Sequence, residues 1–392
     1  MRAGKLGGDA SLHAVNIPLL IPDLPGADEL LPYLRRIDAA RWYTNFGPLV
    51  RELEVRLAAF LSPAGAPPQH AVSVGNATLG LEVALLALEL PPGSRVLMPA
   101  LTFMATATAA MRAGYVPVFC DVDPQSWLLT PEIATRAAQR GRIDAVMPVS
   151  TYGCPCDIEA WDAWAQSTGL PVVIDAAGAF GNQACGARAV TVFSLHATKA
   201  LSAAEGGLVM SADPDYAARV RHLSNFGIDT SVLTPDTAGS TGLVRREGTN
   251  AKLSEYHAAV GLAALERFAA NAARRVDLHR AYLGLLQTQC PQVRTQARAA
   301  EGVYSIFPVC LPEGRKAAAA HLALAGQGIG SRRWYCPPLN QHPAFAALPV
   351  LGELPVCSML GERLLALPFH TLMGRDEATR VVAALAGFLD AA

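Results

Sequence analysis

The sequence predicts an α/β protein in which a mostly parallel sheet is covered by helices. Short apolar segments alternate along the 392-residue chain with stretches whose apolar residues recur every three or four positions. Each apolar segment ends in polar residues before the next helical pattern, which is typical of strands joined by crossover helices. With 51% hydrophobic and 17% charged residues, the chain can bury a sizeable core.

The elements follow in order along the chain. The first helix is expected after Gly47-Pro48, because Val50, Leu53 and Leu57 share one helical face. A second helix is expected over residues 79–90, after the turn at 75–78. Predicted strands then cover 95–98, 116–120, 145–149, 171–174, 190–194 and 207–210, with helices over 102–113, 131–139 and 158–167.

The pattern changes in the last third of the chain. A helical stretch rich in Ala and Arg is predicted from 254 to 287, followed by a strand over 304–311 and helices over 315–325 and 376–389. These shorter elements predict a smaller C-terminal α/β domain. The expected division is an N-terminal segment over 1–30, a large domain over 31–268 and a small domain over 269–392.

Composition argues against several classes of protein. The 32 basic and 33 acidic residues nearly cancel, so no electrostatic footprint for nucleic acid or an anionic membrane is present. The sequence has no apolar run of about 18 residues, and no apolar segment precedes Asp9, so we expect neither a membrane span nor a secretory signal but a cytoplasmic protein. The eight cysteines are scattered, and Cys154-Pro-Cys156 lacks the C-x-x-C spacing, so we expect reduced thiols and no metal site.

Residues that could carry chemistry follow the predicted strands. In an open α/β sheet, ligands bind beyond the carboxyl ends of the strands, which directs attention to Thr78, Phe103, Asp175 and residues 194–199. The chain has only four lysines, and Lys199 lies 24 residues after Asp175. A lysine there can form a Schiff base with an aldehyde cofactor, and the acid can pair with a pyridinium nitrogen. Taken singly, Lys199 could be a solvated lysine on a loop, and Asp175 could be a strand-end turn or helix-cap residue.

Together with its neighbours, this pair resembles a known family. From about Arg41 to Leu389 the chain resembles the DegT/DnrJ/EryC1/StrS family of pyridoxal-phosphate sugar aminotransferases, which have the fold-type-I architecture. That resemblance implies a large domain with a mostly parallel, seven-stranded sheet and a smaller C-terminal α/β domain. The matching segments are 45–48, 75–78, 99–103, 117–123, 152–153, 174–177, 194–199, 205–207, 248–255 and 337–343.

The resemblance implies a role for each matched residue. Lys199 would bind pyridoxal 5'-phosphate covalently and move the proton between substrate and cofactor, and Asp175 would pair with the ring nitrogen. The phosphate would be bound by Ala77, Thr78 and Ser194, and Phe103 would stack on the ring. Asn250 would reach the phosphate of a neighbouring subunit, which requires a homodimer with shared active sites.

Substrate contacts are predicted at six positions. A nucleotide sugar carries a diphosphate, for which Arg332 and Arg333 are candidates, although such a pair can equally be part of the surface. Candidates for contacts to the sugar are Thr44, Asn45 and Tyr335. His196, three residues before the lysine, could face the substrate or merely pack.

The chain departs from the family pattern at two positions. The family usually has Gln three residues after the aspartate, at the cofactor's phenolic oxygen, where this chain has Gly178. The usual His after it is Phe180. Some relatives replace the lysine by His and dehydrate sugars, so Lys199 favours transamination.

The resemblance thus implies transfer of an amino group from glutamate to C4 of dTDP-4-keto-6-deoxyglucose. The product would be a nucleotide amino sugar of the kind used in polysaccharide biosynthesis. Alternatives are a C3-keto-sugar aminotransferase, a pyridoxal-dependent sugar dehydratase, and a non-catalytic paralogue that binds the cofactor, which Gly178 makes conceivable.

Overall fold

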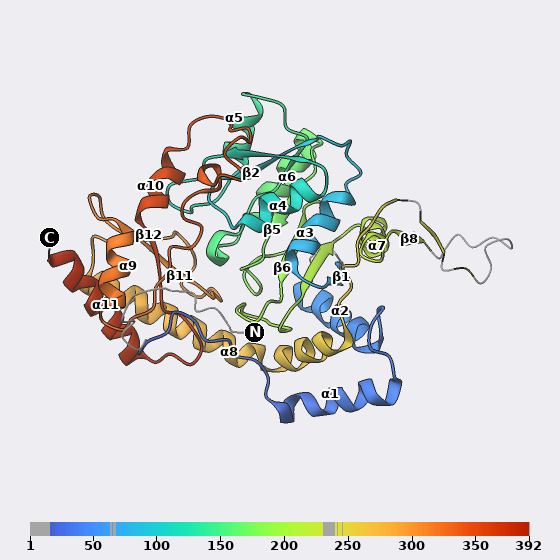
Figure 1. The fold of residues 1–392 in the computed structure, drawn as a ribbon, viewed down its shortest axis with the longest axis horizontal. Coiled ribbons are helices and arrows are strands. Elements are labelled where there is room, and N and C mark those ends of the chain that lie inside the picture. Colours follow the sequence, from blue (N-terminus) through green and yellow to red (C-terminus); the bar gives the residue numbers. More distant parts are fainter. Residues whose placement is uncertain are drawn as a thin grey trace, which may run out of the picture.

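The computed structural model describes residues 16–62, 65, 68–229, 240, 242–244 and 246–391. Figure 1 shows the long helix α8 (Glu255–Gln289) running beneath the rest of the molecule, from α11 (Arg375–Asp390) to α2 (Pro48–Leu61). Helix α1 (Ala27–Ala40) lies below α8, and the C-terminal elements gather at one side (Figure 1).

The central sheet is built from two hydrogen-bonded groups of strands. The first has the order β1-β7-β6-β5, and the second has the order β3-β2-β4. Parallel bridges from Val146 to Val172 and from Val149 to Asp175 join the groups. The strands are β1 (His70–Val74), β2 (Arg95–Pro99), β3 (Val116–Cys120), β4 (Ala145–Val146), β5 (Val173–Asp175), β6 (Val190–Ser194) and β7 (Gly207–Ser211).

Only one strand of this sheet runs against the others. Strand β7 is antiparallel to both β1 and β6, whereas β5–β6, β2–β3 and β2–β4 are parallel pairs. In the described residues, the mostly parallel seven-stranded sheet is therefore confirmed. Strand β1 was not predicted, because its alternation of small and polar residues is weak.

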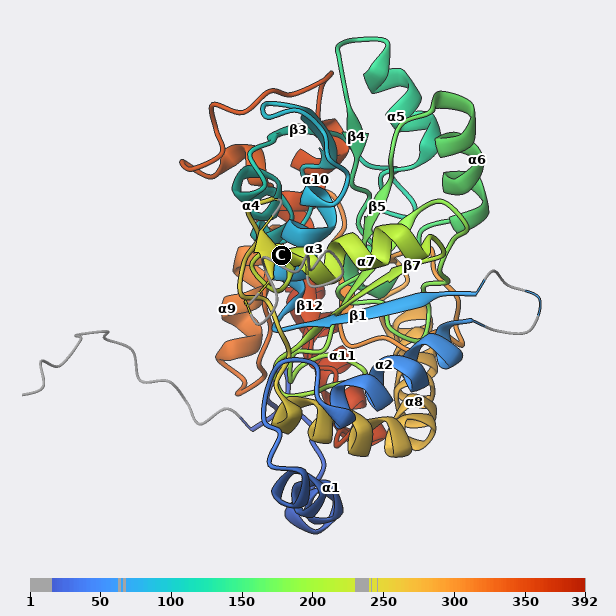
Figure 2. The same ribbon diagram turned by 90° about the vertical axis from the view of Figure 1, so that its right-hand side faces the viewer.

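Helices cover both faces of the sheet, as the alternating pattern predicted. Helix α7 (Pro214–Leu223) lies on one side of β1 and β7, and α2 lies on the other (Figure 2). The remaining helices around the sheet are α3 (Ala77–Leu86), α4 (Met104–Arg112), α5 (Pro131–Ala138) and α6 (Ile158–Thr168). Helices α1 and α7 were not predicted.

A second, antiparallel sheet follows α8. Its order is β10 (Arg294–Thr295), β11 (Phe307–Cys310) and β12 (Leu364–Leu367). Helices α9 (Ala317–Ala325) and α10 (Pro355–Arg363) accompany it, together with α11. The domain boundary predicted between 268 and 269 falls inside α8, and the domain division remains a prediction.

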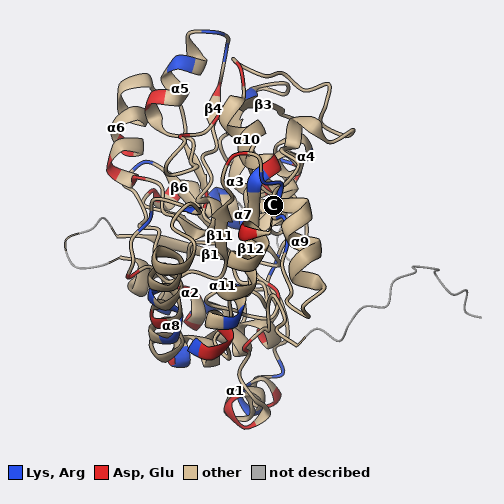
Figure 3. Cartoon of the chain, turned by 90° about the vertical axis from the view of Figure 1, so that its left-hand side faces the viewer, with Lys and Arg blue, Asp and Glu red and all other residues tan. Residues whose placement is uncertain are grey.

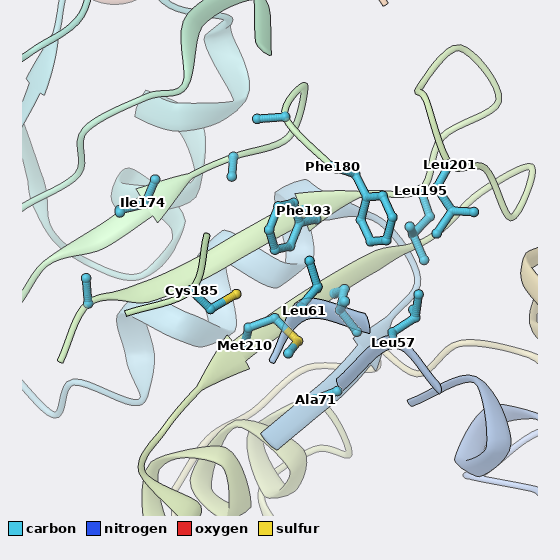
Figure 4. Close-up of a cluster of buried hydrophobic side chains, with 14 of the residues drawn as sticks. Leu57, Leu61, Ala71, Ile174, Phe180, Cys185, Phe193, Leu195, Leu201 and Met210 are labelled. Atoms are coloured by element: carbon cyan, nitrogen blue, oxygen red, sulfur yellow. The ribbon is translucent and has the colours of Figure 1, made fainter. Parts of the chain in front are cut away.

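Helix α8 contributes to two hydrophobic clusters. Phe268 packs edge-on against Phe180, with ring centroids 5.3 Å apart, beneath the central sheet. Phe180 in turn contacts Phe193 of β6, near Leu57 of α2 (Figure 4). Further along α8, Tyr282 stacks on Phe307 of β11 at 4.6 Å. The helix thus connects the cores beneath the two sheets.

The charged side chains follow the outside of this arrangement. Acidic and basic residues are interspersed, and they are densest on α1 and α8 (Figure 3). None of the described helices combines the length and apolar character that crossing a bilayer requires.

Candidate active site

A cavity of about 320 Å³ lies at the carboxyl ends of the parallel strands. It is walled by the ends of β5 and β6, by the first turns of α3 and α4, and by residues around Trp334. Among the residues predicted from the sequence, those that line it are Ala77, Thr78, Phe103, Asp175, Ser194, His196, Lys199 and Tyr335.

Asp175 ends strand β5 and is buried at the cavity floor. Its Oδ2 accepts a hydrogen bond of 2.7 Å from the Thr106 hydroxyl, and its Oδ1 accepts one of 3.2 Å from the Ala177 N–H. Burial raises the pKa of Asp175, while these bonds and Lys199 act in the opposite direction. A cationic ring nitrogen placed against this carboxylate would compensate for the burial.

Lys199 lies in the loop between β6 and β7, at the same cavity floor. Burial lowers the pKa of its amine, and the negative charge of Asp175 acts against that shift. The lowered pKa favours the neutral amine, which is the form that attacks an aldehyde.

A corner suited to an anion lies where three neighbouring strands begin or end. Helix α3 starts directly after β1, and its first-turn N–H groups at Ala77 and Thr78 lack intrahelical acceptors. Ser194 ends β6, and it pairs with Gly207 at the start of β7. A Cβ on Gly207 would lie 2.8 Å from the Ala77 nitrogen and 2.7 Å from the Asn76 carbonyl carbon. Only glycine permits this close approach of backbone.

Aromatic rings form another wall. Tyr335 stacks on Tyr152 with centroids 4.8 Å apart, and Phe103 lies 6.2 Å from Tyr335. The Tyr152 hydroxyl donates to the Trp334 carbonyl at 2.8 Å. Tyr152 and Tyr335 both have positive φ, at 58° and 64°. Such strained residues persist where the surroundings hold them, which is common at functional sites.

The chain before α1 supplies the remaining wall. The Leu19 carbonyl accepts from the Phe369 N–H at 3.0 Å, and the Ile17 carbonyl accepts from the Gly330 N–H at 2.8 Å. Leu19 and Leu20 thereby come to line the cavity beside Phe369. The sequence marked this stretch only as an N-terminal segment.

Five predicted residues lie outside the cavity lining of a single chain. Thr44, Asn45 and Asn250 are exposed. Arg332 lies over the Trp334 ring at 4.4 Å, and Arg333 donates to the Gly361 carbonyl at 2.8 Å.

Gly178 and Phe180, the two residues that depart from the family pattern, lie in different surroundings. Gly178 lines the cavity, where a Cβ would lie 3.4 Å from the Gly153 nitrogen. The nearby Ser150, which also lines the cavity, donates its hydroxyl to Gln183 Oε1 at 2.8 Å. Phe180, in contrast, belongs to the aromatic core beneath the sheet (Figure 4) and is not among the residues that line the cavity.

Two polar residues of the site were missed in the sequence. Thr106 reaches Asp175 from helix α4, three residues after the predicted Phe103, and that spacing on a helix was the available signal. Glu205 lines the cavity opposite His196, and it was noted only as part of a matching segment.

These groups fit pyridoxal phosphate. The chain offers an amine of lowered pKa, a buried carboxylate that a ring cation would neutralise, an aromatic face, and a helix N-terminus against a glycine. The described residues contain no cluster of three or more His, Cys, Asp or Glu side chains suited to a metal. The fold and the site define a pyridoxal-phosphate-dependent enzyme of fold type I.

Comparison with known proteins agrees with this class. Residues 26–386 match the model of the DegT/DnrJ/EryC1/StrS aminotransferase family, and the chain belongs to that family. Protein Rv3402c of Mycobacterium tuberculosis H37Rv is 33% identical, over 94% of this chain and 89% of its own length. The Escherichia coli dTDP-4-amino-4,6-dideoxy-D-glucose transaminase is 29% identical, over 95% of this chain and 98% of its own.

A solved structure gives the same picture. The structure of DesI in the presence of its TDP-sugar product superposes with a TM-score of 0.82 at 34% identity, covering 95% of this chain and 94% of that one. The protein is therefore a pyridoxal-phosphate-dependent aminotransferase of this family.

Proposed function

We propose that the protein transfers an amino group from glutamate to C4 of dTDP-4-keto-6-deoxyglucose. The proposal that the protein is catalytic rests on one observation, which is that Lys199 and Asp175 line the floor of the same cavity. The choice of C4 is supported by the similarity to the E. coli dTDP-4-amino-4,6-dideoxy-D-glucose transaminase. A C3-keto sugar is the alternative acceptor.

The chain's residues divide the work as follows. The bound cofactor supplies an electron sink for the negative charge left at the substrate carbon. Lys199 Nζ would move the proton between the substrate carbon and the aldehyde carbon of the cofactor, and Asp175 would keep the ring nitrogen protonated. Ala77, Thr78 and Ser194 hold the phosphate end, and Phe103 orients the ring.

An absorption spectrum with pyridoxal phosphate, before and after glutamate, tests the first half of the reaction. Wild type should show a lysine-dependent visible band that glutamate converts, and Lys199→Ala should lack it. Aspartate and glutamine serve as competing donors. The position of the new amino group, determined by NMR on products from 4-keto and 3-keto sugars, then tests C4 against C3. An unchanged spectrum with every donor would refute catalysis.

We further propose a homodimer with shared active sites. Asn250 accepts from Lys252 at 2.6 Å, and Lys252 lies 4.7 Å from the exposed Phe226 ring. The exposed Tyr256, which follows Lys252 closely in the chain, stacks on the exposed Tyr43 with ring centroids 6.3 Å apart. Exposed aromatic side chains of this kind favour contact with a second copy. The described residues that line the cavity include no arginine, so a second copy would also bring cations for the diphosphate.

Subunit mixing tests the shared site. Lys199→Ala and Asn250→Ala should each be inactive alone. After reassortment, half of the dimers are mixed and each mixed dimer has one intact site, so about one quarter of wild-type activity should return. If Asn250 serves its own subunit instead, mixing restores nothing.

We also propose a cytoplasmic location. All eight cysteines lie in the described residues and are unpaired. Burial raises the pKa of Cys154 to about 11 and that of Cys156 to about 12, which favours the protonated thiol over the thiolate. Unpaired thiols fit a reducing compartment, and fractionation of the native cells would test the location.

A further inference from the structure

Two polar side chains that line the cavity, His196 and Glu205, face each other. His196 follows strand β6, and Glu205 immediately precedes Gly206 and strand β7. The cavity lining also includes the apolar residues Leu19, Leu20 and Phe369. His196 and Glu205 belong to the same loop between β6 and β7 as Lys199.

The backbone holds the two side chains in this relation. The Leu195 N–H donates to the Gly206 carbonyl, and the Ala197 N–H donates to the Ala204 carbonyl, both at 2.8 Å. The Ala203 N–H returns a bond of 2.8 Å to the Leu195 carbonyl. These bonds on either side of His196 and Glu205 fix the separation of the two backbone positions from which the side chains extend.

The tautomer of His196 follows from its neighbours. The Thr198 N–H donates to His196 Nδ1 at 3.3 Å, so Nδ1 acts as an acceptor. The Thr198 hydroxyl lies 2.9 Å from the same nitrogen and donates as well. In the neutral ring the proton is therefore on Nε2, which faces Glu205.

The gap between the two groups suits a ligand. His196 Nε2 and Glu205 Oε1 are 3.7 Å apart, which is too long for a hydrogen bond, and the side chains are 45% and 54% exposed. No described residue donates a hydrogen bond to the Glu205 carboxylate. The donor, His196 Nε2–H, and the acceptor, the Glu205 carboxylate, do not hydrogen bond to each other. Together they match a ligand group, such as a hydroxyl, that accepts one hydrogen bond and donates another.

We propose that Glu205 and His196 form a subsite for one ring hydroxyl of the sugar. The hydroxyl donates to Glu205 Oε1 and accepts from His196 Nε2–H. The amino donor glutamate carries two negative carboxylates, so the negative charge of Glu205 disfavours its binding at this subsite. The subsite therefore serves only the half of the reaction that uses the sugar. This inference rests on the proposed function and specifies which group of the sugar substrate the protein recognises.

Glu205→Ala and Glu205→Gln test the subsite, with Glu159→Ala on α6 as the matched surface control. Each variant is assayed with glutamate by absorbance, and with the keto-sugar nucleotide together with analogues that each lack one ring hydroxyl. For Glu205→Ala we expect the KM for the full keto sugar to rise about 10- to 50-fold with kcat nearly unchanged. Glu205→Gln, which keeps an acceptor oxygen, should lose less, and the glutamate step should not change.

The analogues decide the assignment. With the sugar that lacks the recognised hydroxyl, Glu205→Ala and wild type should have the same KM. An equal loss with every analogue, a slowed glutamate step, or dissociation of the dimer in light scattering would overturn the subsite. If wild type converts glutamate but aminates no keto sugar, the proposed function itself fails. Discrimination between sugars by their hydroxyls can be measured only if the wild type aminates a keto sugar. A failure of the subsite is therefore distinguishable from a failure of the proposed function.

Discussion

The Thr106 hydroxyl donates a 2.7 Å hydrogen bond to Asp175 Oδ2, linking the start of helix α4 to the end of strand β5. Thr106 itself is fully buried, and its oxygen also lies 2.8 Å from that of Thr102. The carboxylate assigned to the ring nitrogen is therefore oriented by a residue 69 positions away in the chain.

Removing the Thr106 hydroxyl should move the pH dependence of catalysis. The bond lowers the pKa of Asp175, so its loss raises that pKa, and the ionised form is reached only at higher pH. For Thr106→Val, the acid limb of the rate of the glutamate half-reaction should shift upward by about one pH unit. Thr106→Ser should restore the limb. Thr379→Val, whose hydroxyl bonds the Arg375 carbonyl on α11, should leave it in place.

Adding a methyl group at Gly207 should weaken cofactor binding. A Cβ there meets backbone atoms of Asn76 and Ala77 at 2.7 and 2.8 Å, and backbone at a helix start cannot move aside easily. Gly207→Ala should raise the Kd for pyridoxal phosphate at least about tenfold, or about 1.4 kcal/mol, in a fluorescence titration.

Gly284→Ala is the control for that variant. Its Cβ meets nothing within 4 Å on helix α8, so cofactor binding should be unchanged. The free energy of unfolding should rise by about 0.5–1 kcal/mol because alanine favours the helix. Wild-type affinity in Gly207→Ala would show that the corner does not hold the phosphate.

Glu255 should contribute strongly to stability. It is buried at the start of α8, and its two carboxylate oxygens accept from the N–H groups of Leu49 and Val50 at 2.9 and 2.8 Å. Glu255→Ala leaves these buried donors at the start of α2 unpaired and should cost about 2–3 kcal/mol in urea unfolding. Glu52→Ala, which breaks surface ion pairs with Arg36 and Arg56, should cost less than about 1 kcal/mol. Equal losses in the two variants would contradict this assignment.

Phe180 should matter for folding and not for chemistry. Its buried ring contacts Phe193 and Phe268. Phe180→Ala should cost about 3–5 kcal/mol of unfolding free energy with turnover per folded molecule unchanged. Phe60→Ala, which removes a partly exposed ring stacked on Phe180, should cost less than half as much. A selective loss of turnover in Phe180→Ala would instead place this residue in the site.

Much of the fold could be predicted because its signals are local. The strands 95–99, 116–120 and 190–194 are short apolar runs that end in a polar residue or a turn, and they were predicted to within one residue. Strand β1 was not predicted, since its partner β7 lies more than a hundred residues later and its own alternation is weak. Helix α1 was missed as well, because it contains Pro32 and many polar residues.

Part of the cavity lining could be predicted from residue type and spacing. Lys199 and Asp175 each follow a strand, and parallel strands bring their carboxyl ends together, so sequence order alone suggests their proximity. The positions of Arg332 and Arg333 could not be judged this way. Arg333 bonds the Gly361 carbonyl of α10, and Arg332 covers Trp334, contacts that depend on how the C-terminal sheet packs.

The sequence by itself determined the alternation of strands and helices and singled out the lysine and the acid, because these follow from periodicity and residue chemistry. The tertiary structure alone decided that Thr106 orients Asp175, that Glu255 caps α2 from 206 residues away, and that Glu205 faces His196 at 3.7 Å. Such pairings depend on how loops and helix ends pack at the edge of the sheet. No local pattern encodes them, because the free energy of each contact is realised only when distant segments meet.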